Sequence, residues 1–132
     1  MPLERINPTG MYQPNHNIYS QVVKATGGTQ VHVAGTVAFD EEQNVVGIGD
    51  MRAQVLKILE NLQISLNAGG ASRADVVRIN VYALDTDAYV AEGAPEVIAF
   101  FGPTKPVSTT VQVSRLVHPD WLVEIEATAI ID

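Results

Sequence analysis

The sequence predicts an α+β domain, in which a mixed β-sheet of about six strands carries two helices on one face. Two patterns support this prediction. Several segments alternate apolar and polar residues with the period of two that is typical of half-buried strands, and two others repeat apolar residues with the period of a helix. With 132 residues, the chain is long enough for one hydrophobic core and short for two. We therefore expect a single domain over residues 1–132.

The first strands are expected between residues 19 and 39. In "QVHVAGTVAF", every second residue is apolar or small and belongs to one side of a strand: Val31, Val33, Gly35 and Val37. The segment "YSQVVKA" and the turn "TGGTQ" before it predict a β-hairpin with Gly27 and Gly28 at the bend. Residues 40–50 then form a loop with a short extended piece.

Beyond residue 50 the spacing of apolar residues changes from that of a strand to that of a helix, and it predicts two helices. The first begins after Asp50, a favourable N-cap, and ends at Gly69 and Gly70. Its apolar residues recur at spacings of four, four, three and four, so they share one face of the helix: Met51, Val55, Leu59, Leu62 and Leu66. The second helix is expected over residues 87–102, with a kink or a break into two short helices at Gly93 and Pro95.

Three more strands are expected over residues 75–85, 104–116 and 122–131, with a turn at "HPDW" before the last. Their apolar residues can all face the helices, which leaves polar side chains on the opposite face of the sheet: Arg78, Asn80, Ser108, Thr110, Gln112, Ser114, Glu124 and Glu126. This face carries too few charges for a surface that meets only water. We therefore expect copies of the chain to associate through it, with wet clefts between subunits.

Composition argues against several classes of function. Eight basic and fifteen acidic residues give a net charge of −7, which repels nucleic-acid phosphates and anionic membranes. The absence of cysteine excludes disulfides, thiolate catalysis and cysteine-ligated metals. His16, His32 and His118 are scattered, and the glycines match no phosphate-loop spacing, so we expect no metal and no cofactor. No apolar run approaches the ~18 residues of a membrane span and the N-terminus has no apolar leader, so a cytoplasmic location is expected.

Seven segments in order carry a resemblance to a known family: "YSQVV", "VHVAGTVAFD", "MRAQVLKILENLQISLNAGGAS", "DVVRINVYALD", "AFFG", "KPVSTTVQVSRL" and "VEIEA". Over nearly its whole length the chain resembles the YjgF/Rid family of reactive intermediate deaminases. The resemblance implies a chorismate-mutase-like fold and a homotrimer with a central β-barrel and ligand clefts between neighbouring subunits. It also implies chemistry, because RidA-like members hydrolyse imines and enamines derived from amino acids to 2-keto acids and ammonia.

Three positions depart from the family's site. In the best-known branch an Arg holds the substrate carboxylate, and the matching residue here is Ser108 in "KPVST". The family's neighbouring Cys corresponds to Thr110, and an Asn of the second helix corresponds to Ala94. A serine can donate one neutral hydrogen bond but supplies no positive charge.

Other positions match the family's site. Tyr19 fits the aromatic residue that closes over the ligand, and Gly35 fits the strand residue whose backbone approaches it. Glu124 fits the carboxylate that positions a water molecule, whereas Glu126 is given a structural role. Arg78, on the expected polar face, either replaces the missing carboxylate partner or forms an ion pair with one of these glutamates.

These features predict a cytoplasmic Rid-like homotrimer whose clefts bind a small imine, enamine or carbonyl metabolite. If the protein is catalytic, it adds water to a C=N bond, with Glu124 orienting the water, and it acts on a substrate other than the usual free 2-imino acid. General activity on 2-imino acids is expected to be weak or absent, because loss of a charged hydrogen bond costs ~1.5–3 kcal/mol of carboxylate binding.

Three alternatives have different requirements. A non-catalytic trimer could bind or sense a metabolite in the same cleft. A chorismate mutase needs several cationic groups around a dicarboxylate, and the predicted polar face offers only Arg78. Some relatives have been called ribonucleases or translation inhibitors, but the acidic composition disfavours RNA as a ligand.

Overall fold

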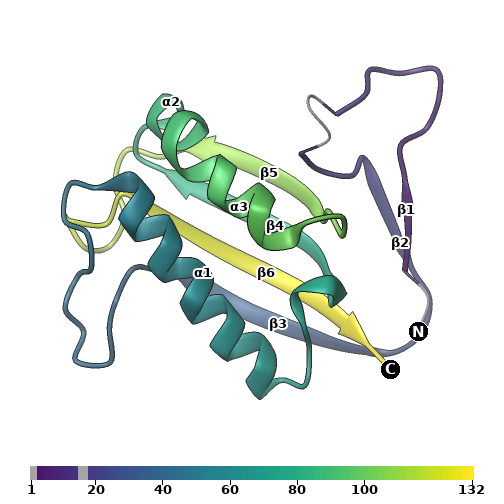
Figure 1. Cartoon of the computed structure of the whole chain (residues 1–132), viewed down its shortest axis with the longest axis horizontal. Helices are drawn as coiled ribbons and strands as arrows, with labels where there is room; N and C mark the ends of the chain where they lie inside the picture. The colour runs from purple at the N-terminus through teal and green to yellow at the C-terminus, as the bar shows by residue number, and fades with distance from the viewer. Residues whose placement is uncertain (1–2, 15–17) are drawn as a thin grey trace.

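The main body of the protein is a four-stranded mixed sheet that carries its helices on one face (Figure 1). A computed structural model describes residues 3–14 and 18–132. The strands lie in the order β3 (Thr29–Thr36), β6 (Val123–Ile131), β4 (Val76–Ala83) and β5 (Val107–Gln112). β6 is antiparallel to both of its neighbours, whereas β4 and β5 are parallel. The predicted α+β class is confirmed.

The first helix, α1 (Met51–Ala68), forms as its sequence pattern predicts. The Asp50 carboxylate accepts a hydrogen bond from the backbone N–H of Ala53 at 3.0 Å, which caps the first turn. Gly70 has a φ of 78°, a left-handed conformation that ends the helix without the penalty of a side chain. All five apolar residues of the predicted face are buried against the sheet.

The second helical segment is broken, as expected, into α2 (Thr86–Ala88), a π-helical turn η3 (Tyr89–Gly93) and α3 (Ala94–Phe101). Gly93 allows the wide turn to pack closely, because a Cβ there would lie 2.8 Å from both Tyr89 and Val55. A short 3₁₀ turn, η2 (Arg73–Asp75), precedes β4. None of the helices within residues 3–14 and 18–132 combines the length and the apolar character that a membrane-spanning helix requires.

The N-terminal strands differ from the prediction. β1 (Leu3–Ile6) and β2 (Val22–Ala25) form a separate antiparallel sheet, so the predicted hairpin between the second and third strands is wrong. Gly27 and Gly28 adopt φ values of 68° and 83°, and here they lead the chain out of β2 without pairing it to β3. We call β1, β2 and the described part of their connection the arm, which stands apart from the main sheet in Figure 1.

The polar residues of β5 lie on the opposite face from the one predicted. The parallel ladder sets three β4 residues that are buried under the helices beside three polar residues of β5: Ile79 with Ser108, Val81 with Thr110, and Ala83 with Gln112. Ser108 and Thr110 therefore face the helices, and the other face of β5 carries Val107, Thr109 and Val111. The alternation separated the residues of the two faces correctly, but it did not show which face meets the helices. Because β5 is an edge strand that the helices cover only in part, its polar residues can lie on the helical side.

The predicted polar face is correct for β4 and β6. Tyr82 lies opposite Glu124, Asn80 opposite Glu126, and Arg78 opposite Thr128, all on the side away from the helices. Between the helices and the other side of these strands lies the core, which includes Val81, Val123 and Ile125. One sheet therefore separates a glutamate-bearing face from the face that carries Ser108.

One fully buried polar side chain, Gln54 of α1, joins three parts of the chain. Its Nε2 donates to the carbonyl oxygens of Gly47 at 3.1 Å and Asp120 at 2.9 Å. Its Oε1 accepts from the backbone N–H of Leu122 at 2.9 Å. A single amide thus ties α1 to the loop before it and to the segment that enters β6.

We expect Gln54→Met to lower the free energy of unfolding by about 2–4 kcal/mol, because three partly buried backbone groups lose their partner. The measurement is urea unfolding of both proteins at one protein concentration. Gln63→Met is the matched control, since that amide bonds the side chain of Asn67 at the surface. Equal small losses in the two variants would contradict this account of Gln54.

Candidate functional site

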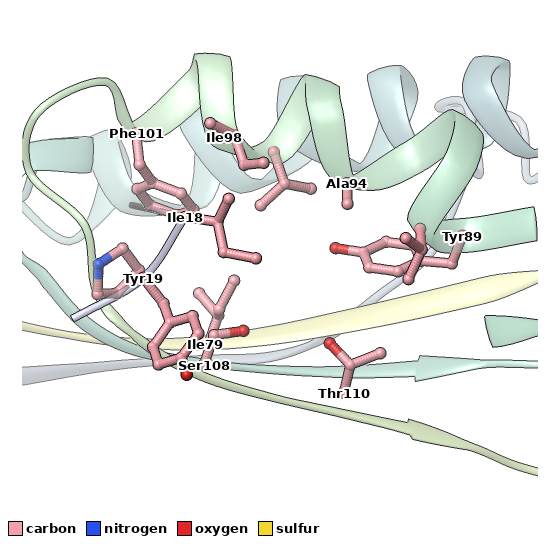
Figure 2. A pocket seen from close by; sticks show the side chains of 12 residues that line it. Ile18, Tyr19, Ile79, Tyr89, Ala94, Ile98, Phe101, Ser108 and Thr110 are labelled. Atoms are coloured by element: carbon pink, nitrogen blue, oxygen red, sulfur yellow. The ribbon is translucent and has the colours of Figure 1, made fainter. Parts of the chain in front are cut away.

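A cavity of about 210 Å³ lies between α3 and β5 (Figure 2). Its walls are mostly apolar and come from α3, from β4 and from the end of the arm: Ile18, Ile79, Val97, Ile98 and Phe101. Four hydroxyl-bearing side chains also line it: Tyr19, Tyr89, Ser108 and Thr110. None of the described residues that line this cavity is charged.

Tyr89 is a site residue that the sequence analysis missed. It is 5% exposed, and burial raises the pKa of its hydroxyl, so the group remains a neutral hydrogen-bond donor at physiological pH. Figure 2 shows this hydroxyl directed into the space between α3 and β5, where no described residue bonds it. The π-helical turn that holds Tyr89 packs against α1 at Gly93, and the break predicted at Gly93 was the only sequence signal for it.

Ser20 fixes the end of the arm against β5. Its backbone N–H donates to the carbonyl oxygen of Pro106 at 3.2 Å, and its Oγ donates to that of Lys105 at 2.7 Å. Tyr19 therefore lies beside Ser108 at the cavity. The structure brings together four of the residues that the resemblance singled out, including Ala94 above them on α3: Tyr19, Ala94, Ser108 and Thr110. Their roles stay predictions.

Arg78 approaches the same region from the other side of the sheet. It lines a second hollow of about 270 Å³ together with Tyr19 and Ser108. Within residues 3–14 and 18–132, Arg78 forms no ion pair, so the predicted pairing with Glu124 or Glu126 is absent from the described part of the chain. A guanidinium thus lies near the cavity but not within it.

Gly35 and Glu124 form a separate group. A β-bulge between Val33 and Thr36 shifts the register of β3 against β6, and the predicted alternation that set Gly35 with Val33 is therefore wrong. Gly35 instead lies next to Glu124, because a Cβ built on it would overlap the Glu124 carboxylate. The absence of a side chain at Gly35 leaves room for that carboxylate, and neither residue lines the cavity under α3.

The two glutamates of β6 have different environments. Glu126 accepts hydrogen bonds from Asn80 Nδ2 at 3.0 Å and from the Tyr82 hydroxyl at 2.6 Å. Its bond to that hydroxyl, more than any other cause, raises the pKa of Tyr82. Glu124 accepts no hydrogen bond from any described residue, and desolvation, followed by the nearby charge of Glu126, raises its pKa. Glu124 is therefore the carboxylate that is free to bind a ligand or a water molecule.

Metal-ligand chemistry finds little support in this geometry. Among the residues that the structure describes, no group of three or more His, Asp or Glu side chains is placed to hold a metal ion. His32 bonds Gln30, and His118 stacks on Trp121. His16 lies outside the described residues.

Comparison with known proteins decides the family. The family described as Endoribonuclease L-PSP matches residues 12–131. The chain belongs to this family, the YjgF/Rid family. The resemblance drawn from the sequence is thereby confirmed, and with it the fold class. The Rid-family residues of interest divide into two groups, Tyr19 with Ser108 and Gly35 with Glu124, on opposite faces of one sheet.

Individual relatives agree. A RutC family protein of Pyrococcus horikoshii is 38% identical over 112 residues, which are 84% of this chain and 85% of that protein. The Rid-family protein YyfB of Yersinia pestis, described as of unknown function, is 35% identical with a TM-score of 0.92 over 99% of this chain and 100% of that one. A YjgF-family protein of Mycobacterium tuberculosis is 32% identical, with a TM-score of 0.68 over 98% of this chain and 100% of its own.

We expect Glu124→Gln to stabilise the protein at about pH 7. Because the pKa of Glu124 is raised on folding, its stabilising contribution is complete below the ordinary glutamate pKa and is lost as the pH rises through the folded-state value. Glu124→Gln avoids this loss of stability, so its gain in the free energy of unfolding over the wild type should vanish below about pH 4. Urea unfolding across this pH range measures the difference.

Glu92→Gln is the control for this prediction, since Glu92 is an exposed residue of η3. It should show no comparable pH-dependent gain. A Glu124→Gln protein that is less stable than the wild type at neutral pH would contradict the assignment of a desolvated carboxylate.

Proposed function

We propose that this Rid-family protein hydrolyses the C=N bond of a small, neutral imine, or of the enamine in equilibrium with it, to a carbonyl product and ammonia. The observation that carries the proposal is the cavity between α3 and β5, with mostly apolar walls, four hydroxyl-bearing side chains and no charge among its described residues. We further propose that it acts in the cytoplasm and without a cofactor.

The cavity favours a neutral substrate. A carboxylate placed there would lose its hydration without gaining a positive partner, which is strongly unfavourable. Neutral donors such as the hydroxyls of Tyr89, Ser108 and Thr110 can instead bond a carbonyl oxygen or an imine nitrogen. A volume of about 210 Å³ suits a short apolar substituent. The serine at the position of the family's Arg is consistent with this environment.

Glu124 is proposed as the group that moves the proton. In this step water adds to the imine carbon, Glu124 accepts the water's proton, and that proton passes to the nitrogen. Glu124 then takes the hydroxyl proton of the resulting carbinolamine and returns it to the nitrogen, so that the C–N bond breaks, the C=O bond forms and ammonia leaves. A carboxylate with a raised pKa and no bonded partner among the described residues suits both proton transfers.

Glu124 must act on the cavity of another copy. Within one chain it lies on the sheet face opposite Ser108, so the two cannot contact the same ligand. We therefore propose the homotrimer with a central β-barrel that the resemblance implies, in which each cleft combines residues of two copies. The exposed Val111 beside the polar groups of β4 supports burial of this face against a neighbour.

A non-catalytic metabolite-binding trimer remains the second candidate. It is favoured by one observation, namely that the cavity itself holds only neutral hydroxyls. The family description names an endoribonuclease, but a net charge of −7 disfavours binding to a phosphate backbone. Tight retention of RNA on a filter at physiological salt would contradict the expectation that this protein does not bind RNA.

The functional test compares two imines generated in situ, a neutral one from an amine oxidase and a carboxylate-bearing one from an amino-acid oxidase. We expect the wild type to accelerate ammonia release from the neutral imine and to act weakly on the other. Glu124→Gln should lose roughly 10²–10⁴-fold in rate. Ser108→Arg should gain about 10–100-fold on the carboxylate-bearing imine, because a charged hydrogen bond is restored.

Glu92→Gln again serves as the control, with an unchanged rate expected. An inert wild type beside an active Ser108→Arg would mean that the water site is intact and the substrate differs. If wild type and Ser108→Arg are both inert, or if Glu124→Gln keeps the full rate, the binding trimer becomes the better account.

A further inference from the structure

Two of the strand edges that are unpaired within the described chain, those of β2 and β3, are close together in sequence. β3 pairs with β6 on one side only, and β2 pairs with β1 alone. A two-stranded sheet with four residue pairs is marginally stable in water by itself. An open edge strand is a ready template for another strand. Because only residues 26–28 separate β2 from β3, the two edges would normally pair with each other.

The contacts of the arm prevent that pairing within one chain. Ser20 bonds the carbonyl oxygens of Lys105 and Pro106, just before β5. Arg5 adds bonds from Nε to the Lys105 carbonyl at 3.3 Å and from Nη2 to the Ala74 carbonyl at 2.9 Å. β5 and β3 are the two opposite edges of the main sheet. A segment held at β5 cannot also lie along β3 of the same chain.

We propose that the arm is exchanged between copies, so that β2 of one copy pairs antiparallel with the open β3 edge of its neighbour. An exchanged segment keeps the contacts that it would make in a closed chain. The register is then that of the hairpin that the sequence predicts, with Ala25 opposite Thr29 and Val23 opposite Val31. Gly27 and Gly28, both with left-handed φ values, form the hinge that leads out of β2.

The side chains match in this register. Val23 and Val31, which face each other, are both half-buried, whereas the next pair, Lys24 and Gln30, is exposed on both strands. The two strands thus present their apolar residues to the same side.

The exchange would also complete the proposed site. Continuing the register places Tyr19 of one copy opposite Gly35 of the next, and Glu124 lies beside that glycine. The cavity of one copy, with Ser108, is then closed by the free carboxylate of its neighbour. Each copy donates its arm to one neighbour and receives one from another, a head-to-tail contact that can close into a ring. This consequence rests on the proposed function, whereas the strand pairing does not.

Disulfide trapping tests the pairing directly, because the natural chain has no cysteine. In Lys24→Cys/Gln30→Cys, the two new thiols face each other across copies, and opposite residues of antiparallel strands are close enough for a disulfide, with Cα atoms about 4.5–5.5 Å apart. After mild oxidation of dilute protein, we expect covalent dimers and larger ring species on a non-reducing gel. A disulfide-bonded monomer would show a closed hairpin, and free thiols would show no pairing. Either result overturns the proposal.

Lys24→Cys/Glu60→Cys is the matched control, since Glu60 is an exposed residue of α1, which belongs to the helical layer and not to the sheet. It should stay uncross-linked, and equal multimer formation there would also overturn the proposal. A mixture of the single variants Lys24→Cys and Gln30→Cys should give a covalent dimer of one copy of each. These outcomes do not depend on imine hydrolysis, so a protein that cross-links but is inert would refute the proposed function alone.

Discussion

The parallel pairing of β5 with β4 is the constraint on which the rest of the site depends. It sets Ser108 beside Ile79 and Thr110 beside Val81, and so turns two hydroxyls toward the helices. The adjacent strand β6 presents Glu124 to the other side. A one-residue change in the register of β5 would exchange these faces and place Thr109 and one valine at the cavity in their stead. The same edge also supplies the backbone carbonyls before β5 that hold the arm.

This arrangement makes a single chain chemically incomplete. The apolar cavity can hold a small ligand and bond it through neutral hydroxyls, but no described side chain within it can exchange a proton near neutral pH. The free carboxylate of Glu124 lies on the other face of the sheet, where it lines a separate, open hollow with Arg115, Leu116 and Val117. In the proposed trimer, association through that face would bring this carboxylate to the cavity of a neighbouring copy, and it would also cover the exposed Val111 of β5.

The sequence predicted those elements in which local and tertiary preferences agree. The N-cap Asp50, the apolar period and the terminal glycines all specify α1, and the strict alternation in β4 and β6 is enforced by burial on one side only. It failed where a distant contact decides. Gly27 and Gly28 suit either a closed hairpin or an open hinge, and Ser20 selects the open form through carbonyls 85 residues away in sequence.

The other residues that the sequence analysis misplaced or overlooked, Gly35 and Tyr89, have local causes. Gly35 lies on the other face because a bulge adds a residue to β3. A pattern with a period of two residues does not reveal such an extra residue. Tyr89 lies in a π-helical turn whose spacing differs from that of an α-helix, so its side chain could not be assigned to the cavity. Its burial is nevertheless consistent with the serine at position 108. A cavity whose burial raises the pKa of a phenol would also disfavour an unpaired carboxylate, so the uncharged Ser108 and the apolar lining both act against binding of a carboxylate.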